Sequence, residues 1–230
     1  MSSLRSTSRR DDGFTLPELM VTIFLIAIIG SVLAGFVSFF SRTFTEERSR
    51  LDSANVAAVG MNEMTRVIRA AIPIKNDFAA SGTGYDPAFV YAGAERLTIN
   101  AGLDTSATLL RPIQVTFSLS STRVLTETRV VPRPGGPTEA QWVFSGAGSS
   151  TTSKAIARTI LSSTGTEPKL FRYYDVNGAE IVAPASGSLT AADMARIATV
   201  KVFLKVQADP TSRAEPVILI NQVGLPNIGL

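Results

Sequence analysis

One ionisable residue stands apart in this sequence: Glu18, a carboxylate followed directly by the uncharged residues 19–41. An apolar run of this length matches the about 20 residues that a helix needs to cross the hydrocarbon layer of a membrane. A carboxylate within such a helix costs about 2.5–3.5 kcal/mol at mid-bilayer and less near the interface, so it tends to mark a functional site. The alternative is that Glu18 lies at the headgroup level and favours the helix N-terminus electrostatically.

The absence of cysteine and histidine excludes several kinds of catalytic and metal site. The chain contains neither cysteine nor histidine, so it has no disulfide, thiolate nucleophile or imidazole base, and no zinc site built on those residues. Carboxylate pairs and calcium sites remain open, but no pair of carboxylates has neighbours that mark it as catalytic. We therefore predict no catalytic residue, no cofactor-binding residue and no metal ligand, and we rank an enzyme behind structural and binding proteins.

The charges around the apolar run predict its orientation. Arg5, Arg9 and Arg10 precede it, so the positive-inside tendency places residues 1–12 in the cytoplasm and the chain after Arg42 outside. The other basic residues are scattered and the formal net charge is +3, whereas nucleic-acid surfaces cluster lysine and arginine. A nucleic-acid partner is therefore possible but unsupported, and the membrane is the first partner that we expect.

Three interpretations of the apolar run compete. A cleaved secretory signal peptide has a shorter core, of about 7–15 residues, followed by a small-x-small cleavage site; no Ala-x-Ala follows this run. A plain single-pass anchor explains the length and the flanking charge but leaves Glu18 without a role. The third interpretation takes Glu18 together with the residues just before it.

The stretch GFTLPELMV, residues 13–21, resembles the N-terminal motif of type IV pilins and pseudopilins. That family has a short basic leader that ends in glycine, then Phe or Met, three apolar or small residues, a glutamate and an apolar helix. Gly13, Phe14 and Glu18 occupy these positions here, after a basic leader. The motif is specific because it combines order, spacing and an uncommon charge in an apolar segment.

The resemblance implies processing and assembly. A membrane prepilin peptidase would remove the cytoplasmic leader, residues 1–13, by cutting between Gly13 and Phe14, and would methylate the new amine of Phe14. Glu18 would pair with the N-terminal amine of a neighbouring subunit, since a carboxylate in an apolar medium needs a partner. The implied partners are this peptidase and methyltransferase, other pilin subunits and an assembly platform protein.

A long helix must present these residues, and we predict it from Leu16 to Ile72. Pro17 is tolerated in the first helical turn, where its missing N–H has no intrahelical partner. Pro73 ends the helical pattern. A helix of this length without an internal proline is unusual in a compact domain, and it is expected for a subunit with an anchor continuous with its head.

The helix is expected to have two halves of different character. Residues 14–41 form the half that spans the membrane or lines a filament core, and residues 42–72 form an extracytoplasmic amphipathic half. Small residues four apart in the first half favour close helix packing: Ala27, Ser31 and Gly35, and again Gly30, Ala34 and Ser38. The second half is predicted to bury one apolar stripe: Phe44, Leu51, Ala54, Ala58, Met61, Met64, Ile68 and Ala71.

Residues 73–230 are expected to form a β-rich globular head, which together with the helix gives an α+β fold. Short alternating runs predict antiparallel strands at residues 88–92, 95–100, 113–119, 122–131, 140–145, 169–176, 179–183, 197–207 and 216–223.

Turn chemistry connects these strands. Asn177-Gly178 is a strong hairpin signal, and residues 120–123 predict a second hairpin. Loops are expected at residues 132–138 and 145–153, the latter as a mobile surface loop. A short helix is expected within residues 189–196, capped by Thr190 with Asp193 three residues on.

The head also bears a looser resemblance. MNEMTRVIRAA, LFRYYDVNGAEI and LTAADMARIATVKVFLKV are similar, in order, to segments of larger minor pilins and J-type pseudopilins, which often cap filament tips. Some pseudopilins bind calcium, and Asp175, Asn177 and Glu180 resemble the start of a calcium loop. A hairpin turn explains the first two of these residues without a metal, and a calcium loop needs more ligands, so we assign no metal here.

Together these features predict a prepilin-like minor subunit of a type IV pilus, a type II secretion pseudopilus or a competence filament. It would be a single-pass membrane protein with a cytoplasmic N-terminus and an extracytoplasmic head, and after cleavage it would enter a filament at the cell surface. The alternative is a membrane-tethered adhesin or binding ectodomain that does not polymerise.

Overall fold

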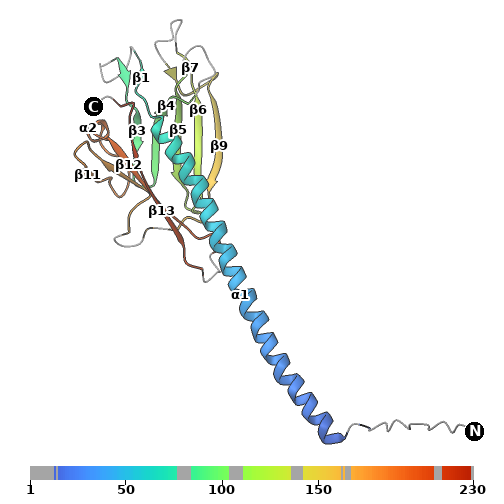
Figure 1. The fold of residues 1–230 in the computed structure, drawn as a ribbon. Helices are drawn as coiled ribbons and strands as arrows, with labels where there is room; N and C mark the ends of the chain where they lie inside the picture. Colours follow the sequence, from blue (N-terminus) through green and yellow to red (C-terminus); the bar gives the residue numbers. More distant parts are fainter. Residues whose placement is uncertain are drawn as a thin grey trace, which may run out of the picture. The chain divides into compact units, whose positions relative to one another are not determined.

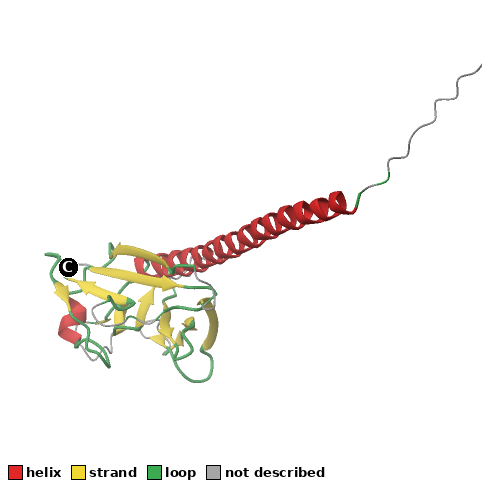
Figure 2. Ribbon diagram, turned by 90° about the horizontal axis from the view of Figure 1, so that it is seen from below, coloured by secondary structure: helices red, strands yellow, loops and turns green. Residues whose placement is uncertain are grey.

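The computed structural model of the chain describes residues 13, 15–76, 84–103, 111–135, 142–161, 163, 167–209 and 214–228. The chain divides into two compact units, Met1–Glu46 and Glu47–Leu230. The first unit contains the beginning of a long helix, and the second contains the rest of it with every described strand (Figures 1 and 2). The predicted α+β fold class is confirmed. Of the predicted leader only Gly13 is described, and Phe14 lies outside the described residues.

The long helix, α1, runs from Leu16 to Arg69. Its first residue agrees with the prediction, but it ends short of the predicted Ile72. The reason is a competing strand contact, because the Ile72 N–H donates to the Asn100 carbonyl at 2.9 Å. The backbone therefore leaves the helix before Pro73 forces it to do so.

Five antiparallel strands form the larger sheet of the head, in the order β3-β4-β5-β6-β9. Their bounds are Phe89–Ala92 for β3, Arg96–Ala101 for β4, Ile113–Leu119 for β5, Leu125–Val131 for β6 and Ser150–Ala157 for β9. The predicted hairpin between β5 and β6 is confirmed: the Arg123 N–H donates to the Ser120 carbonyl at 2.9 Å. Arg123 closes this turn with a φ of 61°, in the left-handed region.

Four strands form the second sheet, in the order β11-β10-β12-β13. Their bounds are Phe171–Tyr174 for β10, Glu180–Ile181 for β11, Thr199–Val206 for β12 and Val217–Gly224 for β13. The predicted turn between β10 and β11 is confirmed, with Gly178 at a φ of 79°. Asp175 Oδ1 accepts the N–H groups of Asn177 and Ala179, each at 2.9 Å, so this carboxylate shapes the hairpin.

Smaller elements complete the head. Helix α2, Ala191–Ala195, is capped as predicted, because the Asp193 N–H donates to Thr190 Oγ1 at 3.1 Å. Two short ladders complete it; one pairs Ile74–Lys75 (β1) with Tyr85–Asp86 (β2), neither of which was predicted, and the other pairs the unpredicted Arg133–Pro134 (β7) with Trp142–Val143 (β8), which lies within the predicted strand 140–145.

The predicted loop at residues 145–153 is wrong in its second half, because Ser150 already begins β9. Its run of serine and threonine has the composition of a loop. Threonine is nevertheless β-branched and suits a strand that finds a partner, and β6 supplies one from Val131↔Ser150 onward. The predicted loop at 132–138 likewise contains β7.

The core of the head lies between the two sheets and the second half of α1. The buried helical positions are Ser49, Ser53, Ala57, Gly60, Met61, Met64, Val67 and Ile68. The predicted stripe is therefore wrong at Phe44, Leu51 and Ala58, which are exposed. Small residues take the inner face there because they let the helix approach the sheets closely.

Candidate assembly site

The first turn of α1 is built from Thr15, Pro17 and Glu18. The Thr15 carbonyl accepts the N–H groups of Glu18 at 3.0 Å and of Leu19 at 3.1 Å, which starts the helical hydrogen-bond ladder. Pro17 lies where an N–H would have no intrahelical acceptor, so it does not interrupt the helix. Glu18 is thereby held in the first turn, as the sequence predicted.

The Glu18 side chain is exposed, and none of the described residues forms an ion pair or a side-chain hydrogen bond with it. Helix N-termini attract negative charge, but that interaction is typically worth only about 0.3–1 kcal/mol. In a membrane or a dry interface the carboxylate would need a cationic hydrogen-bond donor. The first turn therefore presents a carboxylate acceptor, that of Glu18, for which the described residues supply no donor.

The part of α1 that follows its first turn, as far as Phe40, is an apolar helical surface. The most apolar stretch of α1 is not buried at all, and by length and composition this helix can cross a membrane. Its large hydrophobic side chains are exposed on all sides: Leu16, Leu19, Met20, Val21, Ile23, Phe24, Leu25, Ile26, Ile28, Ile29, Val32, Leu33, Phe36, Val37, Phe39 and Phe40. Exposing so much apolar surface to water is unfavourable, so we expect lipid or other helices to cover it.

Polar and small residues in this half do not disturb such an environment. The hydroxyls of Thr22 and Ser31 donate to the carbonyls of Leu19 and Ile28 at 2.9 and 2.8 Å, so neither needs a partner from lipid. A Cβ added at either Gly30 or Gly35 would meet no atom within 4 Å. The packing of the subunit itself therefore does not require glycine at these positions.

The second half of α1 packs against the head through close backbone contacts. A Cβ added at Gly60 would lie 3.0 Å from the Cβ of Ala157 in β9, so the helix and this strand approach closely. Ser53 Oγ accepts the Ala208 N–H at 2.8 Å and donates to the Ser49 carbonyl at the same distance.

An ion cluster joins this helical half to the larger sheet. It contains Glu63 and Arg66 of α1, Glu127 and Arg129 of β6, and Lys154 of β9. Glu63 Oε1 accepts from Arg66 at 2.8 Å, from Arg129 at 2.7 Å and from Lys154 at 2.9 Å. Arg129 also bonds the buried Glu127, and Lys154 Nζ lies 3.1 Å from Glu127 Oε2. Two carboxylates thus share three cations across three elements.

This arrangement changes the acidity of the helical member. The hydrogen bond from Arg66, followed by those in the rest of the cluster, lowers the pKa of Glu63 from 4.5 to about 2, against the opposing effect of burial. The hydrogen bond to Glu63 correspondingly raises the pKa of Lys154. The cluster is a structural clamp: its charges are already paired, and Glu127 is buried.

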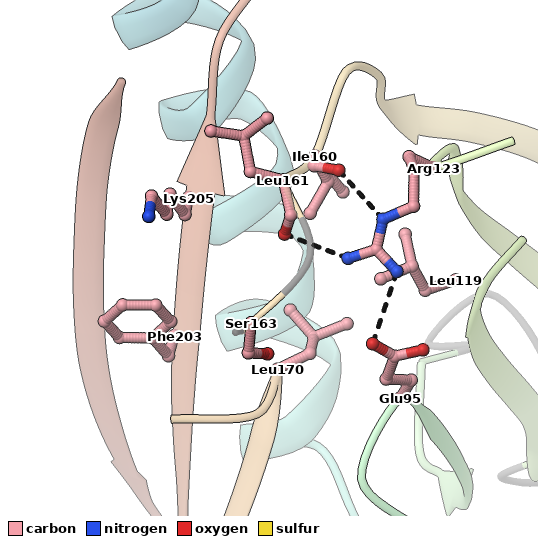
Figure 3. Close-up of a pocket in the computed structure, with 9 residues that line it drawn as sticks. All are labelled: Glu95, Leu119, Arg123, Ile160, Leu161, Ser163, Leu170, Phe203 and Lys205. Atoms are coloured by element: carbon pink, nitrogen blue, oxygen red, sulfur yellow. Dashed lines mark hydrogen bonds and ion pairs between the residues drawn. The ribbon is translucent and has the colours of Figure 1, made fainter. Parts of the chain in front are cut away.

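Figure 3 shows a second clamp, centred on Arg123 at the end of the β5–β6 hairpin. Its guanidinium donates to the carbonyls of Ile160 and Leu161 at 3.0 and 2.9 Å and to Glu95 at 3.3 Å. Ile160 forms a bridge with Val206 of the second sheet, so Arg123 ties the two sheets together. The adjoining cavity, about 10 Å³, holds no more than a water molecule.

Sequence reasoning missed both clamps. The spacing of Glu63 and Arg66, three apart on one helix, was visible, but it predicts only a surface pair. Glu127 gave no signal, because a glutamate in an alternating strand normally faces solvent. Within the described residues no three acidic side chains gather as metal ligands would.

A family model described as the prokaryotic N-terminal methylation motif matches residues 8–34. The match includes Gly13, Phe14 and Glu18 and continues through the exposed apolar part of α1. No curated protein matches the chain.

Proposed function

We propose that this chain, which carries the N-terminal signature of type IV pilins and pseudopilins, is a minor subunit of a filament that assembles through its N-terminal helix. The signature and the long apolar helix support a structural, pilin-like subunit with a membrane anchor. In finer detail, a prepilin peptidase cleaves after Gly13 and methylates Phe14, and Glu18 directs assembly. The filament is a type IV pilus, a secretion pseudopilus or a competence filament.

The observation that carries this proposal is the carboxylate of Glu18, exposed and without a described partner on an apolar helix. In a plain membrane anchor that charge would gain only the weak attraction of the helix N-terminus, about 0.3–1 kcal/mol. A filament core explains it, because a cation from a neighbouring subunit offsets the cost of placing the carboxylate in an apolar medium.

Leader removal supplies the missing cation. While Gly13 is attached, the nitrogen of Phe14 is a neutral amide. Once the Gly13–Phe14 bond is hydrolysed, the same nitrogen becomes an amine that is protonated near neutral pH. Only processed subunits can then neutralise Glu18 of a neighbour, so cleavage and assembly are coupled through one charge pair.

The remaining parts of the chain follow from this arrangement. Residues 14–41 form the membrane-spanning and filament-core half of the helix, and residues 42–72 lie outside the membrane. Residues 73–230 form the head, which contacts neighbouring subunits or caps the filament tip, as in J-type pseudopilins. The partners are the peptidase and methyltransferase, the assembly platform protein, and other subunits.

Replacement of Glu18 tests the proposal. Glu18→Ala should leave membrane insertion and leader cleavage intact and reduce the chain in sheared filaments at least tenfold, because the Phe14 ammonium loses its acceptor. Glu18→Gln should behave like Glu18→Ala if charge is what matters. Glu47→Ala, on an exposed position of the same helix, is the matched control. Normal incorporation of Glu18→Ala would show that this carboxylate does not direct assembly, and absence of the wild-type chain from sheared filaments would favour a tethered ectodomain instead.

A further inference from the structure

One border of the larger sheet is open. β9 is the last strand in the order β3-β4-β5-β6-β9, and Figure 1 shows it as the outermost strand of that sheet. Its residues from Ser150 to Ala155 are all exposed. No described strand pairs with its outer side, so this side carries a row of backbone donors and acceptors with no strand partner.

The hairpin register shows which residues point outward. The Ser120 N–H donates to the Val124 carbonyl at 3.0 Å, so even-numbered residues of β6 bond to β5, because hydrogen-bonded pairs alternate along an antiparallel ladder. Odd-numbered residues of β6 therefore bond to β9, with Glu127 opposite Lys154. On β9 the backbone groups of even-numbered residues therefore bond to β6, and the N–H and C=O groups of Thr151 and Ser153 point to the open side of the strand.

This edge lacks the usual protection against strand pairing. Natural edge strands are protected by prolines, bulges, short length or an outward lysine. From Ser150 to Lys154 β9 has no proline, and its register with β6 is regular; the shift comes only beyond Ala155. Its lysine is engaged in the ion cluster, with Nζ 2.9 Å from Glu63 and 3.1 Å from Glu127.

The other edges of the two sheets differ. β3 has four residues and a register shift, and β11 has two residues. β13 is as long as β9, but its Asn221 side chain bonds to Thr65 of α1 at 2.8 Å. Among the described strands, β9 thus combines length, regularity and an open outer side.

We propose that the outer edge of β9 receives an extended strand from an adjacent subunit of the same filament, which continues the five-stranded sheet across the subunit boundary. The chemistry of the edge selects this occupant. Outward N–H and C=O groups recur at alternate residues, which only an extended backbone matches. The side chains from Ser150 to Ser153 are small and uncharged, and Lys154 is already neutralised, so an uncharged polar strand fits. This inference rests on the proposed filament function.

A proline at an outward position removes one backbone N–H from the open edge and leaves the pairing with β6 unchanged. In Thr151→Pro the lost N–H is one that β6 does not use, and proline is tolerated on an edge strand with its nitrogen facing out. The variant should fold and be processed, yet its amount in sheared filaments should fall at least tenfold. Thr151→Ala, which keeps the N–H, should assemble like the wild type.

Two further measurements keep the test decisive. Thr152→Pro removes an inward donor, so it should lower the thermal unfolding midpoint of the full chain in detergent, whereas Thr151→Pro should not. In the wild type, hydrogen exchange at the amides of Thr151 and Ser153 should slow at least tenfold on assembly. The amides of Thr152 and Lys154 should be protected in both states.

The outcomes separate this inference from the function beneath it. If Glu18→Ala blocks assembly while Thr151→Pro assembles normally and the outward amides stay unprotected, the strand pairing is wrong and the filament function stands. If Thr151→Pro unfolds, the exchange measurement on the wild type decides alone. If Glu18→Ala assembles normally, only the assembly role of Glu18 is wrong, and if the wild-type chain never enters filaments, both proposals fail.

Discussion

At the scale of single residues, the chain handles its carboxylates in two ways. Glu18 has no described partner and lies on an apolar helix, so its charge can be used in assembly. Glu63 is enclosed by Arg66, Arg129 and Lys154 and is used within the fold. The contrast follows from position. The described first turn of α1 contains no cation near Glu18, whereas β6 and β9 bring Arg129 and Lys154 to Glu63.

The Glu63 clamp predicts acid-sensitive stability. Its folded pKa of about 2 lies below the value of 4.5 for a free carboxyl, so the unfolded state takes up the proton first as pH falls. The contribution is complete above about pH 5 and lost as pH falls through 4.5 towards 2. Glu63→Gln should therefore lower the free energy of unfolding near pH 7 by about 1–3 kcal/mol, allowing for partial exposure.

The measurement is denaturant unfolding of the full chain in detergent between pH 2 and pH 7. The difference between the wild type and Glu63→Gln should shrink as pH falls towards 2, while Glu47→Gln should match the wild type throughout. A difference that stays constant across this range would show that Glu63 stabilises the head by packing rather than by charge.

At the scale of elements, α1 changes its environment within a single helix. Its first half presents large apolar side chains on every side, and its second half turns small residues inward against the sheets. Gly60 marks a close approach to the larger sheet, since an added Cβ would lie 3.0 Å from Ala157. Close packing there leaves no room for a larger side chain, because interiors are packed to crystal-like density.

Enlarging this contact should destabilise the head. Gly60→Val places branched carbons against Ala157 and Leu204 and should cost about 1–3 kcal/mol by overpacking. Ala58→Val adds the same kind of side chain at an exposed position of the same helix and should change stability by less than about 0.5 kcal/mol. Thermal unfolding of the two variants, followed by circular dichroism, makes the comparison. Equal midpoints would contradict the close contact.

At the scale of the whole molecule, the chain combines a motif for processing, a helix that can cross a membrane and a β-rich head. The three parts fit one function if the motif yields a new N-terminus, the helix holds subunits together and the head contacts neighbouring subunits. In the proposed function the order along the chain is also the order of use, because the leader would be removed before the helix leaves the membrane.

The state of the N-terminus is the corresponding prediction. Chain purified from membranes of cells that contain a prepilin peptidase should begin at methylated Phe14, and mass spectrometry of the N-terminal peptide reads this directly. In cells without that peptidase the chain should keep its leader. Gly13→Val should also keep the leader, since it changes the glycine that the motif places before the cut, and an intact leader in all three cases would indicate a simple tether.

The sequence by itself determined the features that depend on neighbouring residues. The start of α1 at Leu16, the turns at Arg123 and Gly178, and the cap at Thr190 follow from local sterics and hydrogen bonding, so they were predicted. The apolar run and the motif around Glu18 were equally local.

Only the tertiary structure decided what depends on residues far apart in the chain. β9 is a strand because β6 pairs with it, and the inward face of α1 begins at Ser49 because the sheets lie there. Glu127 is buried because Arg129 and Lys154 neutralise it. The physical reason is common to all three: a local pattern records what a residue prefers, whereas pairing and burial depend on which partners the fold brings to it.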